Sequence, residues 1–230
     1  MIQAIFFDFN GVIIDDERLQ MAAYQDVLRE HAIELSEADY FGALGMDDKT
    51  FVRAAFARTN RTLTAAVLEA ILSGKAARHR KLIAGELPLF PGIVTFLKAA
   101  SRDYQLGVVS MAGLNEIDYA LARANVSALF TVVVSAEDVS ICKPAPDCYR
   151  RALAKLNERR REQQLISLTA NDCLVVEDSP PGIESGKQAG MRTLGVTNTV
   201  AETALRAAGA EVVTHNLADW NVDAVRHVFN

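Results

Sequence analysis

The 230-residue sequence predicts an α/β fold in which a doubly wound parallel sheet forms the core and an all-helical domain is inserted after the first strand. Three observations predict this fold. Short apolar runs recur along the chain, helix-period segments separate most of them, and one long stretch has no strand-like run. Continuous rather than alternating apolar runs indicate strands that are buried on both faces, as in parallel sheets. Their alternation with helices is typical of doubly wound folds.

The expected strands are short segments rich in apolar and β-branched residues: Ile2–Phe7, Leu106–Ser110, Thr131–Ser135, Cys173–Glu177, Thr193–Val196 and Glu211–Val213. Helix-period apolar residues lie between them, at Leu114–Ala124, Asp147–Asn157, Gly182–Ala189 and Val200–Ala208. The charged run Glu158–Glu162 is expected to be a solvated helix end. Together these segments predict a Rossmann-like core with helices on both faces of the sheet.

The inserted domain is predicted from the Ala-, Leu- and Arg-rich stretch between Glu17 and Gly85, which has no convincing strand. Its exit is marked by Pro88, Pro91 and Gly92, which interrupt the helical pattern. We expect hinges near residues 14–18 and 84–90. The predicted core therefore comprises residues 1–15 and 88–230, and the helical domain comprises residues 16–87.

Composition excludes several classes of protein. The 24 basic and 29 acidic residues give a net charge of -5, which disfavours non-specific nucleic-acid binding. No apolar run approaches the roughly 20 residues of a membrane span, and no basic segment with a cleavage site begins the chain. Three cysteines without a CxxC spacing, and histidines at 31, 79, 215 and 227 without a metal-ligand spacing, indicate neither a disulfide framework nor a zinc site. We expect a cytoplasmic protein, monomeric or weakly dimeric, without nucleic-acid or membrane partners.

Polar residues follow four of the expected strands at their carboxyl ends, where open α/β sheets bind ligands. Asp8, Asn10 and Gly11 follow the first strand, Ser110 and Met111 end the second, Lys143 follows the third, and Glu177 and Asp178 end the fourth. Each residue alone has an ordinary structural explanation as a turn, strand-end or capping residue. Four such groups in order predict one site.

The residue types at these strand ends are those that phosphoryl transfer requires. A carboxylate, Asp8, can attack phosphorus while a cation, Lys143, offsets the charge on the phosphate oxygens. The Ser110 hydroxyl and nearby backbone N–H groups, including those of Gly11 and Met111, are candidates to hold a phosphate. Glu177 and Asp178, together with Asp8, offer hard oxygen ligands for Mg²⁺.

These motifs resemble those of the haloacid dehalogenase superfamily, in the branch with a helical cap inserted after the first motif. The stretches Lys143-Pro-Ala-Pro-Asp147 and Glu177-Asp-Ser-Pro-Pro-Gly182 are especially similar to the subgroup of β-phosphoglucomutase and phosphoglycolate-phosphatase-like enzymes. The resemblance implies that Asp8 forms an aspartyl-phosphate and that the residue at position 10 offers its backbone carbonyl to Mg²⁺. It also implies that the side chain at position 10 transfers protons and that the cap selects the substrate.

Asn10 departs from the pattern of that family, because an amide cannot take a proton from attacking water at neutral pH. Three interpretations remain open. Asn10 is natural and another base replaces it, the protein holds phosphate without hydrolysing it, or an Asp→Asn change was introduced that traps a complex. Asp16 is one candidate base, although a charge at a helix N-terminus is the favoured interpretation of that residue. Deamidation of Asn10 is a second route to a carboxylate.

The predicted activity is Mg²⁺-dependent hydrolysis of a small phosphorylated metabolite. A sugar-phosphate mutase is the alternative enzyme, but Asp16 and Gln20 stand where the resemblance to the mutase leads us to expect Thr and His. A catalytically impaired phosphate-binding or regulatory protein is the third possibility. The segment Gly45–Lys49 resembles the cap loop that reaches into the cleft. Lys49, Lys75 and Arg78 are interpreted as solvated helix residues.

Overall fold

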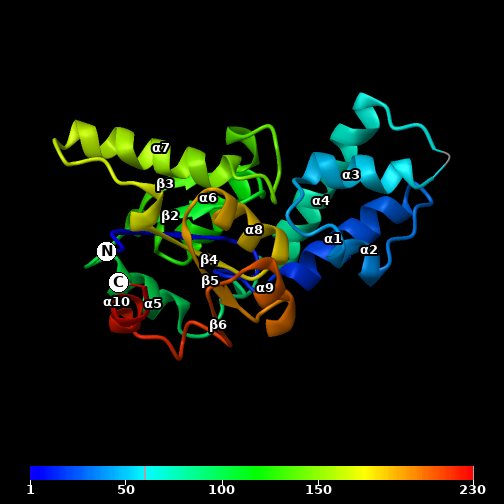
Figure 1. The fold of residues 1–230 in the computed structure, drawn as a ribbon. Coiled ribbons are helices and arrows are strands. Elements are labelled where there is room, and N and C mark those ends of the chain that lie inside the picture. The colour runs from blue at the N-terminus through cyan, green and yellow to red at the C-terminus, as the bar shows by residue number, and fades with distance from the viewer. Residues whose placement is uncertain (60, 230) are drawn as a thin grey trace.

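The computed structural model describes residues 1–59 and 61–229, and these residues form one parallel sheet of six strands. The strands are β1 (Ala4–Phe7), β2 (Gln105–Val109), β3 (Phe130–Val134), β4 (Cys173–Glu177), β5 (Arg192–Val196) and β6 (Val212–Thr214). Their order is β3-β2-β1-β4-β5-β6, and every neighbouring pair is parallel. The order reverses direction at β1, so helices are laid on both faces (Figure 1). The predicted fold class is confirmed.

Helices cover both faces because the strand residues are apolar on both sides. One core cluster includes Phe7 of β1 and side chains from α5 (Ile93–Ala100), α6 (Leu114–Arg123) and α10 (Val222–Phe229). The other includes Phe6 of β1 and side chains from α7 (Asp147–Glu162). The remaining core helices are α8 (Pro180–Gln188) and α9 (Glu202–Ala208), with short 3-10 turns at Ser127–Leu129, Ala136–Asp138 and Ala170–Asp172.

The end of α7 is the solvated helix end that its charge run predicts, except at one residue. The helix continues to Glu162, and within the run Arg160 is buried. Its guanidinium donates hydrogen bonds to the Ile166 carbonyl oxygen at 2.7 Å and to Gln105 Oε1 at 2.5 Å. Arg160 therefore ties the helix end to the beginning of β2, while its neighbours Arg159 and Arg161 are exposed.

Four helices follow the first strand: α1 (Glu17–Arg29), α2 (Glu37–Phe41), α3 (Asp48–Ala57) and α4 (Ala65–Leu82). They pack around an apolar cluster of their own, which includes Tyr24, Leu28, Phe51 and Ile71. Side chains of Ser36, Asp47 and Thr64 accept the N-terminal hydrogen bonds of α2, α3 and α4. These helices, called the cap below, stand at one end of the sheet (Figure 1).

The chain leaves and re-enters the core through two segments that lie side by side. Asp15 N donates to the Pro88 carbonyl oxygen at 2.7 Å, and Phe90 N donates to that of Ile13 at 3.3 Å. An antiparallel bridge joins Ile14 to Leu89. The hinge is thus a paired strap, which holds the cap above the carboxyl ends of the strands.

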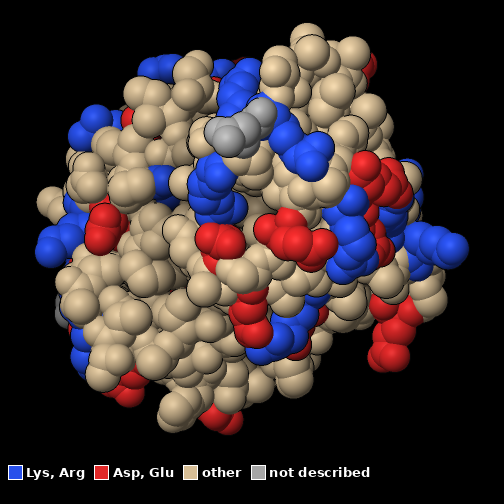
Figure 2. Space-filling view, turned by 90° about the vertical axis from the view of Figure 1, so that its right-hand side faces the viewer, with Lys and Arg blue, Asp and Glu red and all other residues tan. Residues whose placement is uncertain are grey.

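The outer face of the cap carries charges of both signs, with acidic and basic side chains intermixed (Figure 2). Within the described part of the chain, none of the helices combines the length and the apolar character needed to cross a bilayer.

Candidate active site

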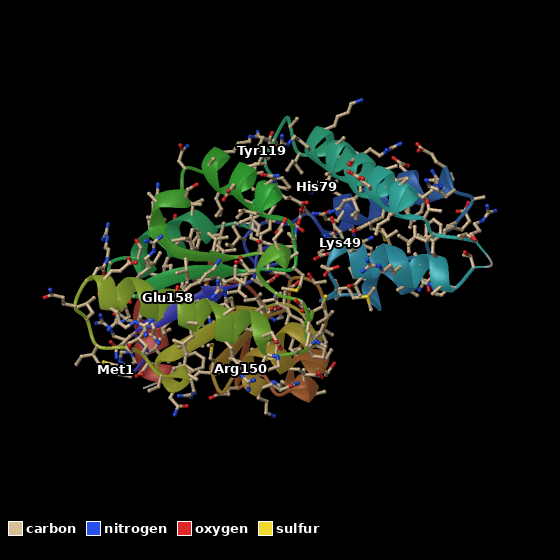
Figure 3. All side chains as sticks on the ribbon, turned by 90° about the horizontal axis from the view of Figure 1, so that it is seen from above. Met1, Lys49, His79, Tyr119, Arg150 and Glu158 are labelled. Carbon is tan, nitrogen blue, oxygen red and sulfur yellow. The ribbon has the colours of Figure 1, made fainter. Side chains whose placement is uncertain are left out.

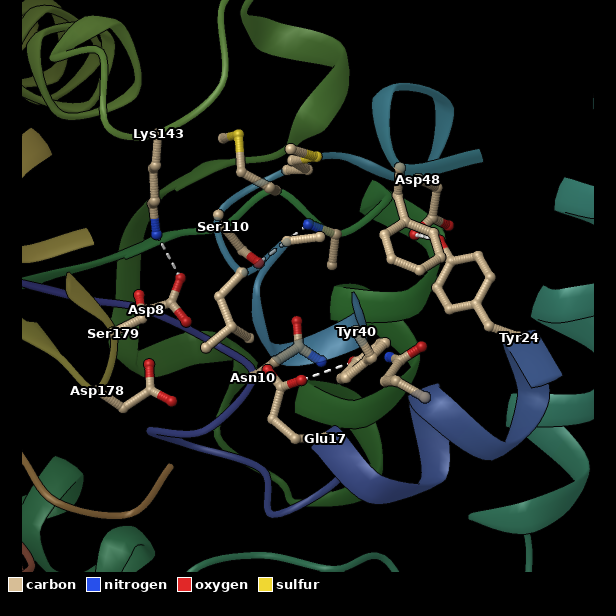
Figure 4. Close-up of a pocket in the computed structure, with 18 of the residues that line it drawn as sticks. Asp8, Asn10, Glu17, Tyr24, Tyr40, Asp48, Ser110, Lys143, Asp178 and Ser179 are labelled. Carbon is tan, nitrogen blue, oxygen red and sulfur yellow. Dashed lines mark hydrogen bonds and ion pairs between the residues drawn. The ribbon is translucent and has the colours of Figure 1, made fainter. Parts of the chain in front are cut away.

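A pocket lies between the carboxyl ends of the strands and the cap (Figure 4). Its core wall, as we call the side formed by the sheet, consists of Asp8, Asn10, Ser110, Met111, Ala112, Lys143, Asp178 and Ser179. Its cap wall consists of Glu17, Gln20, Tyr24, Tyr40, Asp48, Phe51 and Lys75, with Ala43, Leu44, Gly45 and Met46 from the loop before α3. Most residues predicted from the strand ends therefore meet at one site, as does most of the predicted cap loop.

Lys143 connects the two carboxylates at the centre of the core wall. Its Nζ lies 2.6 Å from Asp8 Oδ1 and 2.6 Å from Glu177 Oε1, and it donates to the Val109 carbonyl oxygen at 3.2 Å. Lys143 and both carboxylates are buried. Such short, charge-assisted contacts fix the ammonium beside one face of Asp8.

Burial controls the protonation of this group of charges. Desolvation raises the pKa of Asp8 to about 7, against the lowering effect of Lys143. Burial acts to lower the pKa of Lys143, but Asp8 and Glu177 outweigh it, and the net shift is upward. Lys143 is accordingly a permanent cation, whereas the ionised form of Asp8 depends on neighbouring positive charge.

Three carboxylates, those of Asp8, Glu177 and Asp178, form a cluster in which one oxygen of each lies within 4.8 Å of the others. Burial, followed by the charge of Glu177, raises the pKa of Asp178 well above its usual value. Asp178 Oδ2 is buried without a hydrogen-bond partner. A buried, unpartnered carboxylate oxygen is costly unless a cation neutralises it, so these residues fit a hard divalent ion.

Two glycines make room for the acidic cluster. A Cβ on Gly11, which has a φ of 76°, would lie 1.9 Å from Asp178 Oδ2. A Cβ on Gly182 would lie 2.0 Å from Glu177 Oε2. Gly11 N donates to the Ile14 carbonyl oxygen at 2.9 Å and Gly11 is outside the pocket lining, so its predicted use as a phosphate donor has no support in this geometry.

Ser110 lies at the end of β2, and its Oγ accepts a hydrogen bond from Ala112 N at 3.0 Å. Ser110, Met111 and Ala112 are buried and line the pocket, to which Lys143 also belongs. The hydroxyl proton of Ser110 is directed away from Ala112 N because its oxygen is the acceptor there. This arrangement suits a phosphate oxygen as the acceptor.

Asn10 is held by Asp16 and lies in Figure 4 between Asp8 and Tyr40. Its Nδ2 donates to both carboxylate oxygens of Asp16, at 2.9 and 3.1 Å. Asp16 is fully buried and occupies the N-cap position of α1, yet its side chain makes no capping hydrogen bond. Asp16 therefore stands at a helix N-terminus as interpreted, but its carboxylate accepts from the Asn10 amide rather than from the first backbone N–H groups of α1.

The cap wall contributes buried and partly buried polar groups that the sequence predictions do not include. Tyr40 donates to Glu17 Oε2 at 2.6 Å, and burial raises the pKa of Glu17 to about 8. Tyr24 donates to Asp48 Oδ1 at 2.5 Å. Glu17, Gln20 and Tyr24 are spaced at i, i+3 and i+7 on α1, which places their side chains on one face of the helix. That spacing was the sequence pattern from which a polar pocket wall could have been predicted.

Lys75 is not a solvated helix residue, which corrects the sequence interpretation. It is 2 % exposed, and its Nζ lies 3.2 Å from Asp48 Oδ2 and 3.3 Å from Glu116 Oε2. Burial acts to lower its pKa, but these two carboxylates produce a net rise. Lys75 therefore presents a fixed positive charge to the pocket, whereas Lys49 is exposed as predicted.

The sheet topology, the inserted helices and the Asp8–Lys143–Asp178 arrangement are those of the class that the sequence resembles. The chain belongs to the haloacid dehalogenase-like hydrolase family, which matches residues 5–196. It is 28% identical over 222 residues to hexitol phosphatase B of Escherichia coli (strain K12), covering 95% of this chain and 94% of that protein. It spans only 20% of the length of another relative, the Arabidopsis thaliana protein SUPPRESSOR OF QUENCHING 1, chloroplastic, which is 24% identical over 97% of this chain.

Solved structures agree with this assignment. CbbY from Rhodobacter sphaeroides in complex with phosphate has a TM-score of 0.78 and 27% identity, covering 95% of this chain and 96% of that chain. An Asp→Asn variant of that CbbY is in complex with xylulose-(1,5)bisphosphate, with the same TM-score of 0.78 and identity of 27%. β-Phosphoglucomutase from Clostridium difficile has the same fold, with a TM-score of 0.86, 19% identity and coverage of 100% of this chain and 98% of that chain.

Proposed function

We propose that the protein is a Mg²⁺-dependent phosphohydrolase that cleaves small phosphorylated metabolites through an aspartyl-phosphate on Asp8. The observation that carries this proposal is the contact of Asp8 with Lys143 at 2.6 Å beside the acidic cluster, at the floor of a pocket. A carboxylate nucleophile, a fixed cation and a divalent ion together offset the charge of a phosphoryl group. Relatives named as phosphatases support the same activity.

The ion would be held by Asp8, Asp178 and the backbone carbonyl of Asn10, and its charge would draw the anionic phosphate to an anionic nucleophile. Glu177 has a different balance of contacts. Its Oε1 accepts from Lys143 and from Tyr149 at 2.8 Å, and its Oε2 accepts from Ser179 at 3.2 Å. Glu177 therefore mainly positions Lys143 and adds negative charge to the cluster, while Asp178, whose Oδ2 has no hydrogen-bond partner, is the stronger candidate for direct ligation.

In the first chemical step, an Asp8 carboxylate oxygen forms a bond to phosphorus as the bond between phosphorus and the substrate oxygen breaks. The departing oxygen needs a proton. Glu17 lines the pocket and, with a pKa of about 8, is protonated at neutral pH. Because Tyr40 donates to Oε2, a protonated Glu17 carries its proton on Oε1. We assign to Glu17 the general acid function that Asn10 cannot perform.

In the second step, water attacks phosphorus and the bond to Asp8 breaks. With Nδ2 engaged by Asp16, Asn10 retains Oδ1 as an acceptor that orients the water. The water's protons leave on phosphate oxygens, so Asp8 returns as a carboxylate and phosphate departs as a monoanion. An amide suffices for orientation, although the absence of a base slows this step, typically by about 10²–10⁴-fold.

The cap wall favours a substrate rich in hydroxyl groups. Glu17, Gln20, Tyr24 and Tyr40 offer hydrogen-bond donors and acceptors, and Lys75 offers one ammonium group. A sugar or polyol phosphate matches these groups better than an apolar ester does. Because Asp48 and Glu116 already pair with this ammonium, it offers a hydrogen-bond donor rather than an uncompensated charge.

The test is phosphate release from a panel of sugar, polyol and organic phosphates, with Mg²⁺ and with a chelator. Multiple turnovers that need Mg²⁺ and disappear in Asp8→Asn are expected. Conversion of a sugar phosphate to its isomer without phosphate release would instead establish a mutase. Turnover that persists in Asp8→Asn would contradict the covalent mechanism.

A phosphate-holding protein is the second candidate, and Asn10 is the residue that favours it. The Asp→Asn variant of CbbY has a bound bisphosphate, which is consistent with a site that retains its ligand when an amide replaces the carboxylate. Such a protein would bind the substrate and release at most one leaving group per chain. Rapid-quench measurement distinguishes a single burst from continued turnover.

A further inference from the structure

A second group of polar side chains lies behind the cap wall of the pocket, where the cap meets the core, and only Gln20 belongs to both. It consists of Asp16 at the hinge, Gln20 on α1, His79 on α4 and Glu116 on α6, and we call it the hinge cluster. Figure 3 shows His79 at the seam between the cap helices and the core, on the side of Tyr119. The cluster thus joins three segments that are distant in sequence.

The ligand-type atoms of the hinge cluster converge. His79 Nε2 lies 2.8 Å from Asp16 Oδ2, and His79 Nδ1 lies 3.4 Å from Glu116 Oε1. One ligand atom each from Asp16, His79 and Glu116 lies within 4.8 Å of the others. Gln20 Nε2 contacts both Asp16 Oδ2, at 3.1 Å, and Glu116 Oε1.

Two atoms of this cluster lack the hydrogen bonds that burial normally requires. His79 Nε2 is close to Asp16 Oδ2 but out of line for a hydrogen bond, and Gln20 Oε1 is buried without a partner. Buried polar atoms without a hydrogen-bond partner call for an explanation, and a bound ion is one that would satisfy both. A half-turn of the Gln20 amide would place its oxygen where Nε2 contacts Asp16.

Charge and access also suit a cation. Asp48 and Glu116 share one ammonium, that of Lys75, while Asp16 contacts only the His79 imidazole among the basic groups, so carboxylates outnumber lysines here. His79 and Glu116 also line a second cavity, between α4 and α6. That cavity gives an ion a route to the cluster that does not pass through the active-site pocket.

We propose that the hinge cluster binds a divalent transition-metal ion of the zinc class. One imidazole nitrogen and two carboxylates, with the Gln20 amide or water as the fourth ligand, match the preference of zinc for mixed nitrogen and oxygen ligands. Mg²⁺ and Ca²⁺ prefer oxygen ligands alone, so they favour the Asp8–Glu177–Asp178 cluster. This proposal does not depend on the proposed phosphatase activity.

Binding there has a structural consequence, because the ligands come from both the cap and the core. An ion shared by Asp16, His79 and Glu116 would hold α4 against α6 and restrain the hinge. It would also fix the carboxylate that orients Asn10. The ion would therefore favour the closed cap and slow substrate exchange.

The test counts Zn²⁺ bound per chain by equilibrium dialysis, in wild-type protein and in an Asp178→Asn background that weakens the other acidic cluster. His79→Gln should remove one Zn²⁺ per chain in both backgrounds. His227→Gln, at an exposed histidine of α10, is the matched control and should change nothing. Circular dichroism checks that each variant is folded.

Glu116→Gln, at a side chain 14% exposed, gives an independent variant if His79→Gln does not fold. It should weaken Zn²⁺ binding at this site by at least about 10²-fold, beyond the 10–100-fold typical of losing an outer-shell partner. Co²⁺ should give visible absorption bands that Zn²⁺ removes and that His79→Gln lacks. An unchanged Zn²⁺ count in both His79→Gln and Glu116→Gln would overturn the proposal. It would also be overturned if Asp178→Asn alone removed all the Zn²⁺ that wild-type protein binds.

Discussion

The two walls of the pocket are built from different kinds of structure. The core wall comes from strand ends, where Lys143 is joined to Asp8, and to Glu177 behind the wall, by contacts of 2.6 Å in a buried group. The cap wall comes from helices joined to the core by two straps, and its groups pair mainly with one another, as Glu17 does with Tyr40. A rigid wall suits chemistry that demands fixed geometry, and a hinged wall suits admission and selection of a substrate.

The largest expected effect is on the core wall. Asp8→Asn removes the nucleophile, so kcat should fall by something on the order of 10⁶-fold, the loss seen when a covalent nucleophile is removed. The measurement is phosphate release under saturating substrate. Asp15→Asn, the same change at an exposed residue of the hinge, is the control and should leave kcat within a few fold of the wild-type value.

If the core wall alone performs the chemistry and the cap wall only selects the substrate, no cap-wall residue should take part in the reaction. Glu17 tests this division of roles. If Glu17 is the general acid, Glu17→Gln should lower kcat by about 10²–10⁴-fold. The active form of Glu17 is protonated, so its contribution to kcat should be complete below its pKa of about 8 and be lost as pH rises through that value. The variant should lose this descending limb.

An unaltered pH profile in Glu17→Gln would assign Glu17 to substrate binding alone. The division between a chemical wall and a selecting wall would then hold without exception.

Lys75 and Lys49 form a matched pair, because both belong to the cap and only one is buried. Lys75→Met leaves Asp48 and Glu116 without their cation, and both are partly exposed. The free energy of unfolding should therefore fall by about 3 kcal/mol, the low end for a broken buried ion pair. Lys49→Met should change it by less than about 0.5 kcal/mol. Urea denaturation measures both, and equal losses would contradict the assignment of Lys75 to the pocket.

The difference between the walls also explains what the sequence could predict. A strand end can be located from a short stretch of sequence, because an apolar run is followed there by polar residues. Parallel strands bring those ends to one edge of the sheet. Asp8, Ser110, Lys143 and Asp178 could therefore be placed together from the sequence. The fold class was predictable for the same reason, although α10 was not identified.

Helix residues give a weaker signal, because the same spacing describes a solvated face and a pocket wall. Lys75 and His79 are one turn apart on α4, and nothing in their spacing shows that Glu116 of α6 approaches them from the core. Asp16 is ambiguous for a related reason. Its position before a helix predicts a cap, whereas the fold gives it a closer partner in Asn10. Tertiary contacts decided both cases.

The smallest expected change in kcat comes from Asn10→Asp, although this substitution restores a carboxylate at position 10. Asn10→Asp would supply the missing carboxylate, but Asn10 Nδ2 lies 2.9 and 3.1 Å from the two oxygens of Asp16. Two carboxylates at that distance cannot both ionise readily, so one takes a proton and its pKa rises. The single variant should therefore change kcat by less than about 10-fold, an order below the usual value of a base.

Pairing Asn10→Asp with Asp16→Asn exchanges the two groups and restores an amide donor to a carboxylate acceptor. If water activation limits turnover, kcat of the double variant should exceed that of either single variant by about 10²-fold, which is the lower end for a general base. A double-mutant cycle on kcat measures this coupling. Additive effects would show that Asp16 and position 10 act independently, and the cap hinge would then have no part in the chemistry of the core wall.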